Sequence, residues 1–163
     1  MESKSTLTSE LERSAKNRSG GNIVNDAEVD VARHLVRQLV ACGVKLSSIG
    51  LISPFRAQAS LLEASREIHD WKLHGLEVST IDRYQGRDKD VIILSLVRSN
   101  TKGRVGRLLQ DARRLNVAVT RAKCKLLMVG SLSTLRAGCR DVLGAALNRL
   151  EEDADILRLP SQV

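Results

Sequence analysis

Two arginines in a basic segment have the type and spacing to contact phosphate groups. Arg114 and Arg121 stand seven residues apart in Asp111–Lys125, which reads DARRLNVAVTRAKCK. On a helix this separation is about two turns, so the two side chains project in similar directions. A planar, permanently charged arginine can bind phosphate oxygens in pairs, or neutralise a γ-phosphate during phosphoryl transfer. A salt-bridged amphipathic helix would explain the same residues.

A glycine with polar neighbours forms a second candidate, in the segment VSTIDRYQGRDKD from Val78 to Asp90. Gly86 would let the backbone approach a phosphate or a ribose closely. Gln85 and Asp88 would supply donors and acceptors beside it, and Thr80 could contact a phosphate backbone. On residue types alone, a polar surface turn with glycine at a positive φ explains this segment better.

The third candidate segment, ISPFRAQ, places an aromatic ring, a cation and an amide at the end of an expected strand. They are Phe55, Arg56 and Gln58, and Phe55 is the only phenylalanine of the chain. Its ring could stack on a base, although a core role is at least as plausible for a single aromatic residue. We expect a packing role for Trp71, and surface positions for the histidines, which have no ligand spacing: His34, His69 and His74.

The elements that must position these residues alternate between strand and helix. The continuous apolar segment 91–97 predicts a central parallel strand, covered on both faces. Further strands are expected at 49–52, 77–79, 125–130 and 156–159, and helices at 29–40, 57–69 and 111–122. The first helix should be capped by Asn25 or Asp26, and the third by Asp111. This order predicts an α/β fold with a parallel sheet and helices on both faces.

Ligands of such sheets bind in loops beyond the carboxyl ends of the strands. Three segments are therefore expected to matter: 53–58, 79–90 and a loop that begins at residue 98 and leads to Asp111. Residues 99–110 contain two glycines and three basic residues, which indicates a loop rather than a helix.

The positive charge of the chain is concentrated. The 163 residues have a net charge of +7, and the segment 98–125 alone holds nine basic residues and one acidic residue. This asymmetry indicates a phosphate-bearing partner, although a solvated helix face is an equally good explanation of charge alone.

Composition narrows the class of protein. Apolar residues make up 42% of the chain and aromatic residues 2%, so aliphatic side chains must form the core. No apolar run is long enough for a membrane span, and the first residues lack a signal peptide pattern. The three cysteines, Cys42, Cys124 and Cys139, match no metal or disulfide pattern, and we expect reduced thiols in or near the core and no metal site.

Taken together, the three segments resemble helicase motifs IV, V and VI of the 5′-to-3′ branch of superfamily 1 helicases, in the right order. The likeness covers about residues 23–135. It implies a RecA-like domain of the P-loop NTPase type over residues 22–163. The polar and charged composition of residues 1–21 predicts a flexible segment before this domain. Within the family, LLQD before the paired arginines, TRAK, and LPS near the end are most similar to the replication helicase/nuclease branch.

The resemblance implies roles for individual residues. Arg121 corresponds to the arginine finger, Gly86 to the phosphate-proximal glycine, and Asp88 to the ribose contact. Gln85, Phe55, Arg56 and Gln58 are further candidates for nucleotide binding, although Phe55 replaces a residue that is often tyrosine. The candidates for contact with a nucleic-acid strand are Ser53, Thr80, Arg98, Asn100 and Arg114.

The sequence contains no GxxxxGK[ST] phosphate loop and no motif II acidic pair. The resemblance thus implies that ATP and Mg²⁺ are shared with a first RecA-like domain, and that these residues alone do not hydrolyse ATP. An iron–sulfur cluster would belong only to a nuclease region outside this sequence. The expected partner is single-stranded DNA in the nucleus, with no membrane contact; mitochondrion and cytoplasm are alternative locations.

Three alternatives remain open at this point. The first is an RNA helicase of the nonsense-mediated-decay type, whose motif V is very similar. The second is a nucleic-acid-binding module without turnover. The third is a degenerate paralogue that acts as a scaffold, which fits least well because the whole of motif VI is present.

Overall fold

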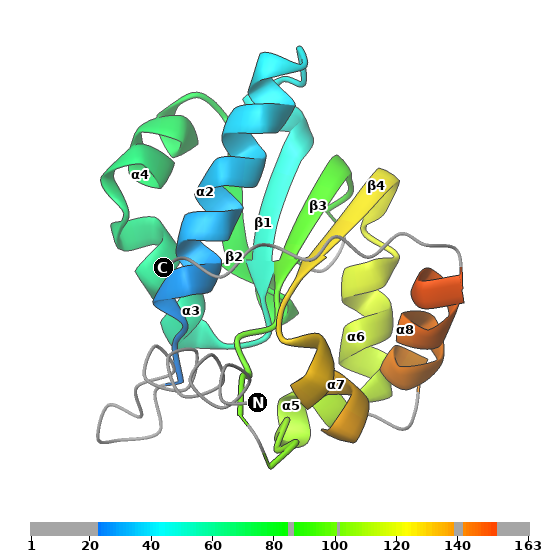
Figure 1. Cartoon of the computed structure of the whole chain (residues 1–163). Coiled ribbons are helices and arrows are strands. Elements are labelled where there is room, and N and C mark those ends of the chain that lie inside the picture. The colour runs from blue at the N-terminus through cyan, green and yellow to red at the C-terminus, as the bar shows by residue number, and fades with distance from the viewer. Residues whose placement is uncertain (1–22, 85–86, 101, 139–141, 153–163) are drawn as a thin grey trace, which may run out of the picture.

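The computed structural model describes residues 23–84, 87–100, 102–138 and 142–152, which form a three-layer α/β fold (Figure 1). The strands of the middle layer are β1 (Ile49–Ser53), β2 (Glu77–Thr80), β3 (Lys89–Ser95) and β4 (Ala122–Val129). The α-helices are α2 (Asp26–Ala41), α3 (Arg56–Ala64), α4 (Arg66–Leu73), α5 (Arg107–Gln110), α6 (Ala112–Val119), α7 (Leu132–Gly138) and α8 (Val142–Glu152). Two short 3-10 helices are η1 (Leu46–Ser48) and η2 (Asp82–Tyr84).

The sheet is parallel throughout the described residues, with the strand order β2-β1-β3-β4. Strand β3 lies between β1 and β4, and its residues from Val91 to Ser95 are all buried. These findings confirm the predicted α/β class, the parallel sheet, and the central position of the apolar segment.

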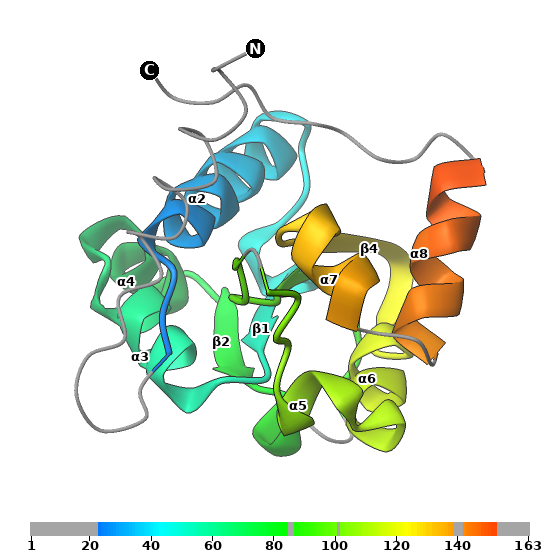
Figure 2. The ribbon, with the colours of Figure 1, turned by 60° about the horizontal axis from the view of Figure 1, so that its bottom comes forward.

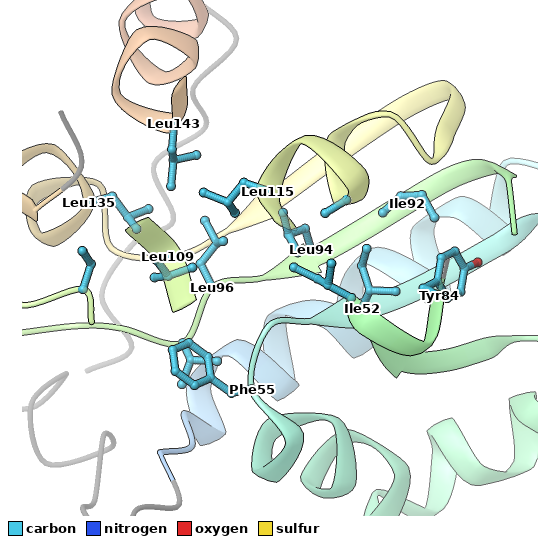
Figure 3. Close-up of a cluster of buried hydrophobic side chains, with 14 of the residues drawn as sticks. Ile52, Phe55, Tyr84, Ile92, Leu94, Leu96, Leu109, Leu115, Leu135 and Leu143 are labelled. Atoms are coloured by element: carbon cyan, nitrogen blue, oxygen red, sulfur yellow. The ribbon is translucent and has the colours of Figure 1, made fainter. Parts of the chain in front are cut away.

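Each face of the sheet is covered by its own helices (Figure 1). Because successive side chains of a strand point to opposite faces, Leu51 and Ile93 enter the core beneath α2, α3 and α4, whereas Ile52 and Leu94 enter the other core. Figure 3 shows this second core, in which Leu115 of α6, Leu135 of α7 and Leu143 of α8 converge on the sheet. All four strand side chains are fully buried, and each contributes about 1.5–3 kcal/mol to stability.

Both predicted helix caps are confirmed. The Asn25 side chain accepts a hydrogen bond from the Glu28 N–H (3.2 Å) at the start of α2. The Asp111 side chain accepts from the N–H of Arg113 (3.1 Å) and of Arg114 (3.3 Å) at the start of α6.

Several predicted boundaries were wrong. The segment expected to be one helix over 57–69 is two helices, because Ser65 adopts an extended conformation (φ −68°, ψ 121°) between α3 and α4. The short helix α5 lies inside the segment predicted as a loop. Helix α6 ends at Val119, where the Thr120 hydroxyl donates to the Asn116 carbonyl (2.8 Å), and β4 starts at Ala122 because that residue pairs with Lys89.

Some expectations concern residues outside the described ranges. They are the flexible segment over 1–21, the strand over 156–159, and the positions of Gln85, Gly86 and Cys139.

A close approach between β1 and η2 makes Gly50 a sensitive position. A Cβ atom on Gly50 would lie 2.2 Å from the Tyr84 hydroxyl oxygen and 2.7 Å from Ile92 Cδ1. Tyr84 is fully buried, so its ring has little room to move away. We predict that Gly50→Ala lowers the free energy of unfolding by about 1–3 kcal/mol through overpacking, measured by urea denaturation.

Gly130→Ala is the matched control for this substitution. Its added Cβ would first meet the flexible end of Leu135 at 3.2 Å, so a smaller loss of stability is expected. Equal stability of Gly50→Ala and the unsubstituted chain would contradict the prediction, because it would show that Tyr84 moves away from the added Cβ without loss of free energy.

Candidate functional site

The candidate residues lie at two opposite edges of the sheet. Ser53 is the last residue of β1 and Arg98 follows β3, so both lie at the carboxyl edge, which comes forward in Figure 2. Asp88 immediately precedes β3 and Arg121 immediately precedes β4, so both lie at the amino edge. The expectation that all ligand segments gather beyond the carboxyl ends was wrong in this respect. The segment 79–90 starts at one edge and ends at the other, because β2 and β3 are parallel and this connection must cross the sheet.

At the amino edge, the Arg121 guanidinium is held by three contacts. Its Nη1 donates to Asp88 Oδ1 (2.8 Å), its Nε to the Val117 carbonyl (3.2 Å), and its Nη2 to Thr120 Oγ1 (3.3 Å). The side chain retains 24% exposure, so the cation is fixed in place and still reachable from solvent. This is the arrangement expected of a group that must meet an anion without first being ordered.

The backbone of Arg121 is also anchored to the central strand. Its carbonyl accepts from the Lys89 N–H (3.1 Å), and the pairing of β3 with β4 shifts register between Lys89 and Val91. Such irregularities are common beside functional sites, because they redirect the side chains at the end of a strand. Asp88 and Arg121, which the sequence separates by 33 positions, are thus brought together by one strand pair.

At the carboxyl edge, Arg98 lies against the ring of Phe55. The guanidinium carbon is 5.7 Å from the ring centroid, within the range of a cation–π contact. Phe55 itself is only 8% exposed, and Figure 3 shows it in the core cluster near Leu96 and Leu109. This placement favours the core role of Phe55 over stacking on a base.

The loop around Gly106 also packs against Arg98. Gly106 has a φ of 76°, and a Cβ there would lie 2.8 Å from Arg98 Nη2. Burial lowers the pKa of the Arg98 guanidinium, and its Nε is buried without a hydrogen-bond partner among the described residues. A partly desolvated cation of this kind would gain from a bound phosphate.

The other candidates at the carboxyl edge differ in their access to a ligand. Arg56, the first residue of α3, is exposed, and Thr80 at the end of β2 is half-buried. Ser53 is fully buried, and its hydroxyl accepts from the Phe55 N–H (3.2 Å). The Asn100 amide closes the following loop, since it donates to the Arg104 carbonyl and accepts from the Arg104 N–H, both at 2.8 Å.

Gln58 lies where a direct nucleotide contact is not possible in this conformation. Its side chain is fully buried. Its oxygen accepts from the Asn25 N–H (2.8 Å), and its nitrogen donates to the Asn25 carbonyl (3.0 Å) and to Ser95 Oγ (3.2 Å). Both amide hydrogens are therefore in use, and the structural role of Gln58 is to join α3 to the start of α2.

Sequence reasoning missed the carboxylate beside this amide. Glu28 is 5% exposed, and its Oε2 accepts from Ser95 Oγ (2.6 Å) and from the Val97 N–H (2.9 Å). The signal was present in the sequence, because Glu28 precedes Ala32 and Val36 by one and two helical turns and so shares their buried face. We call Asn25, Glu28, Gln58 and Ser95 the polar cluster.

Burial raises the pKa of Glu28 to about 7, because a carboxylate loses its hydration inside the protein. Hydrogen bonds from Ser95, Val97 and Leu96 oppose this rise, since they stabilise the charged form.

The basic segment is partly neutralised within the structure. Arg114 Nε lies 3.3 Å from Asp82 Oδ1 and 3.5 Å from Asp111 Oδ2, with 40% of the side chain exposed. Arg114 therefore has acidic partners, and a nucleic-acid phosphate would have to compete with them.

The histidines and Trp71 lie as predicted. His34, His69 and His74 are exposed, and Trp71 packs, half-buried, against the core beneath α2. Cys42 and Cys124 are free and exposed rather than in or near the core, where we had placed them. In the described ranges, no group of acidic, histidine or cysteine side chains could hold a metal ion. No helix there has the length and apolar character needed to cross a membrane.

Comparison with known proteins gives a family match and close relatives. The model of the family described as "AAA domain" matches residues 3–133. The DNA replication ATP-dependent helicase/nuclease DNA2 of Xenopus laevis is 43% identical over 140 residues, covering 86% of this chain and 13% of that protein. Its Schizosaccharomyces pombe counterpart is 44% identical over 135 residues, covering 83% of this chain and 9% of that protein.

A third relative carries a different description. The DNA polymerase alpha-associated DNA helicase A of Saccharomyces cerevisiae is 44% identical over 137 residues, covering 83% of this chain and 20% of that protein. The chain thus spans between 9% and 20% of the length of these three relatives.

The raised pKa of Glu28 predicts a specific dependence of stability on pH. The folded chain holds this proton up to about pH 7, whereas an unfolded chain releases it near 4.5. The folded state therefore binds more protons between these values, and its stability falls as pH rises through them. We predict that Glu28→Gln removes this loss, which is on the order of 3 kcal/mol, in urea titrations at pH 5 and 7.5.

The difference in stability between the two proteins is the quantity to measure, because they differ only at position 28. A constant difference in stability at the two pH values would contradict the assignment of a neutral Glu28.

Proposed function

This chain belongs to the AAA domain family of superfamily 1 helicases, and we propose that it is the second motor domain of an ATP-dependent DNA helicase. The RecA-like fold class expected from the sequence is confirmed by the family match and the parallel sheet. In the proposal, residues 22–163 are this domain. It supplies an arginine finger at one edge and part of a single-strand track at the other.

The observation that carries the proposal is the fixed position of Arg121. Its guanidinium is partly exposed and its backbone is bonded to β3. The Asp88 carboxylate neutralises it at 2.8 Å. We propose that a γ-phosphate replaces Asp88 as the partner of Arg121, and that the released carboxylate then accepts hydrogen bonds from the ribose hydroxyls.

ATP with Mg²⁺ is the proposed cofactor, and it supplies the phosphoryl group that is transferred to water. The residues described here fit one side of such a site. They offer a cation for the phosphate and a carboxylate for the sugar, but no cluster of metal ligands. We propose that a first RecA-like domain holds the phosphates and the metal ion. Gln85 and Gly86 of the present chain would contact the same nucleotide. Arg56 is exposed at the carboxyl edge, at the opposite end of the sheet from Asp88 and Arg121, so it is not part of this proposed nucleotide site.

Single-stranded DNA is the proposed ligand of the carboxyl edge. Arg98 offers a partly desolvated cation there, and the exposed Arg104 and Arg107 follow it on the same side. Thr80 and Asn100 border this surface, and Arg114 would join the track by exchanging its acidic partners for phosphates. The relatives described above are named as DNA helicases, which favours DNA over RNA.

The wider role of the protein follows from the relatives only as a proposal. The helicase/nuclease names support a nuclear function in DNA replication or repair. The Saccharomyces cerevisiae relative, which is named only as a helicase, is equally similar, and we propose that this segment is a motor domain of the kind found in both relatives. A nuclease region, with an iron–sulfur cluster, would lie elsewhere in a longer protein.

The arginine finger can be tested in a two-domain assembly. Residues 22–163 would be fused behind the first motor domain of the yeast DNA helicase A relative, in place of its own second domain. We predict that Arg121→Ala lowers DNA-stimulated ATP hydrolysis on the order of 10³-fold, because the transition-state charge loses its stabiliser.

Lys123→Ala is the control, since Lys123 is an exposed cation in β4, two positions after Arg121. Turnover that survives Arg121→Ala would refute the finger, and ATP hydrolysis by the isolated chain would refute the division of the site between two domains.

The strand-binding edge can be tested on the isolated chain. We predict that Arg98→Ala weakens binding of a fluorescent oligothymidylate about threefold to tenfold at 50 mM salt, and lowers the salt slope by about one. Fluorescence anisotropy at several salt concentrations measures both quantities.

Arg66→Ala serves as the charge-matched control, because Arg66 is exposed at the start of α4 in the opposite helix layer. No binding at low salt would contradict the track, and an equal loss for Arg66→Ala would show unspecific charge attraction.

A further inference from the structure

The chain turns sharply where β3 ends, in a conformation that a β-branched residue rarely adopts. Val97 has a φ of 70°, and the Arg98 N–H donates to the Leu96 carbonyl two residues earlier (2.7 Å). This is a γ-turn of the rare, strained form. A valine at positive φ costs free energy and persists only where its surroundings hold it.

The polar cluster supplies this hold. The Val97 N–H donates to Glu28 Oε2 (2.9 Å), and the Val97 carbonyl accepts from Asn25 Nδ2 (3.1 Å). Both polar groups of the strained residue are therefore bound by the start of α2, about 70 positions away in the sequence. The Val97 side chain is fully buried, so core packing also holds this residue in place.

The cluster is itself tied to the other elements of the carboxyl edge. Ser95 Oγ donates to the same oxygen of Glu28 (2.6 Å), and Gln58 donates to Ser95 Oγ (3.2 Å) from α3. The first turns of α2 and α3 and the end of β3 thus share one hydrogen-bonded network.

We propose that Asn25 and Glu28 are positioning residues, which hold the Val97 turn so that Arg98 faces the phosphate of a bound strand. This inference rests on the proposed role of Arg98 in binding single-stranded DNA. Arg98 is the next residue, so the direction of its side chain depends on the Val97 backbone. If Val97 relaxed to a negative φ, the guanidinium would leave its place between Phe55 and Gly106.

The combination of costs argues for function rather than stability alone. A buried carboxylate loses hydration, and a valine at positive φ is strained. An apolar side chain at position 28 would avoid the loss of hydration. A straight continuation of β3 would avoid the backbone strain at Val97. Strain that other residues hold in place is typical of sites where a side chain must be aimed.

Asn25→Ser removes the contact of this side chain with the Val97 carbonyl but keeps the cap of helix α2. Serine caps helices about as well as asparagine, but its hydroxyl is too short to reach the Val97 carbonyl. The contacts of Gln58 with Asn25 use only backbone atoms of residue 25, so they survive the change. The fold is checked by circular dichroism and thermal unfolding.

The test is a double-mutant cycle on oligothymidylate binding by the full chain. We expect Asn25→Ser to weaken binding about threefold to tenfold, and to have no further effect in an Arg98→Ala background. Equal weakening in both backgrounds, or none in the unsubstituted chain, overturns the positioning role. If Arg98→Ala itself binds normally, the proposed function of Arg98 fails first, and the positioning role falls with it.

Position 28 gives an independent second measurement. Glu28→Gln keeps an acceptor for the Val97 N–H, and should bind within about twofold of the unsubstituted chain. Glu28→Leu removes both acceptor oxygens at similar volume, and should weaken binding in step with Asn25→Ser. Similar affinity of the glutamine and leucine variants would also overturn the proposal.

Discussion

The central strand β3 is the constraint on which both candidate sites depend. It forms ladders with β1 and β4, and its residues from Val91 to Ser95 are buried. Asp88 directly precedes it and Arg98 follows it closely, so the two candidate sites lie at opposite ends of one rigid element roughly 20 Å long. Such a strand cannot bend without losing ladder hydrogen bonds. In the proposed motor, nucleotide and nucleic acid would therefore act on a single body.

The sequence predicted the parts of the fold that depend on local pattern. The apolar segment 91–97 identified the central strand, because a parallel strand covered on both faces needs no polar alternation. The caps Asn25 and Asp111 were found for a similar reason, since a cap acts within one helical turn. Boundaries were less predictable. Only the pairing with Lys89 shows why β4 starts at Ala122, and that pairing is not visible in either strand alone.

The polar cluster shows where such reasoning stops. Asn25, Gln58 and Ser95 look unrelated in the sequence, and Gln58 was expected to contact a nucleotide. Their shared role is to hold the strained backbone of Val97. The sequence does not predict this strain, because valine normally favours extended conformations. Only Glu28 could have been recognised in the sequence, because it is a carboxylate on an apolar helix face. A charged residue at a buried position of a predicted helix is therefore a signal that a distant backbone group needs a partner.

The structure also changes the meaning of the concentrated positive charge. Arg98, Arg104 and Arg107 follow the end of β3, whereas Arg121 precedes β4 at the opposite edge. The exposed Lys123 and Lys125 lie in the first half of β4. Helix α6 separates the two groups, and Arg114 within it already contacts Asp82 and Asp111. The basic segment is thus not one patch on the surface. Its charges divide between two edges, as the two proposed roles, contact with a nucleotide phosphate and contact with a nucleic-acid backbone, require.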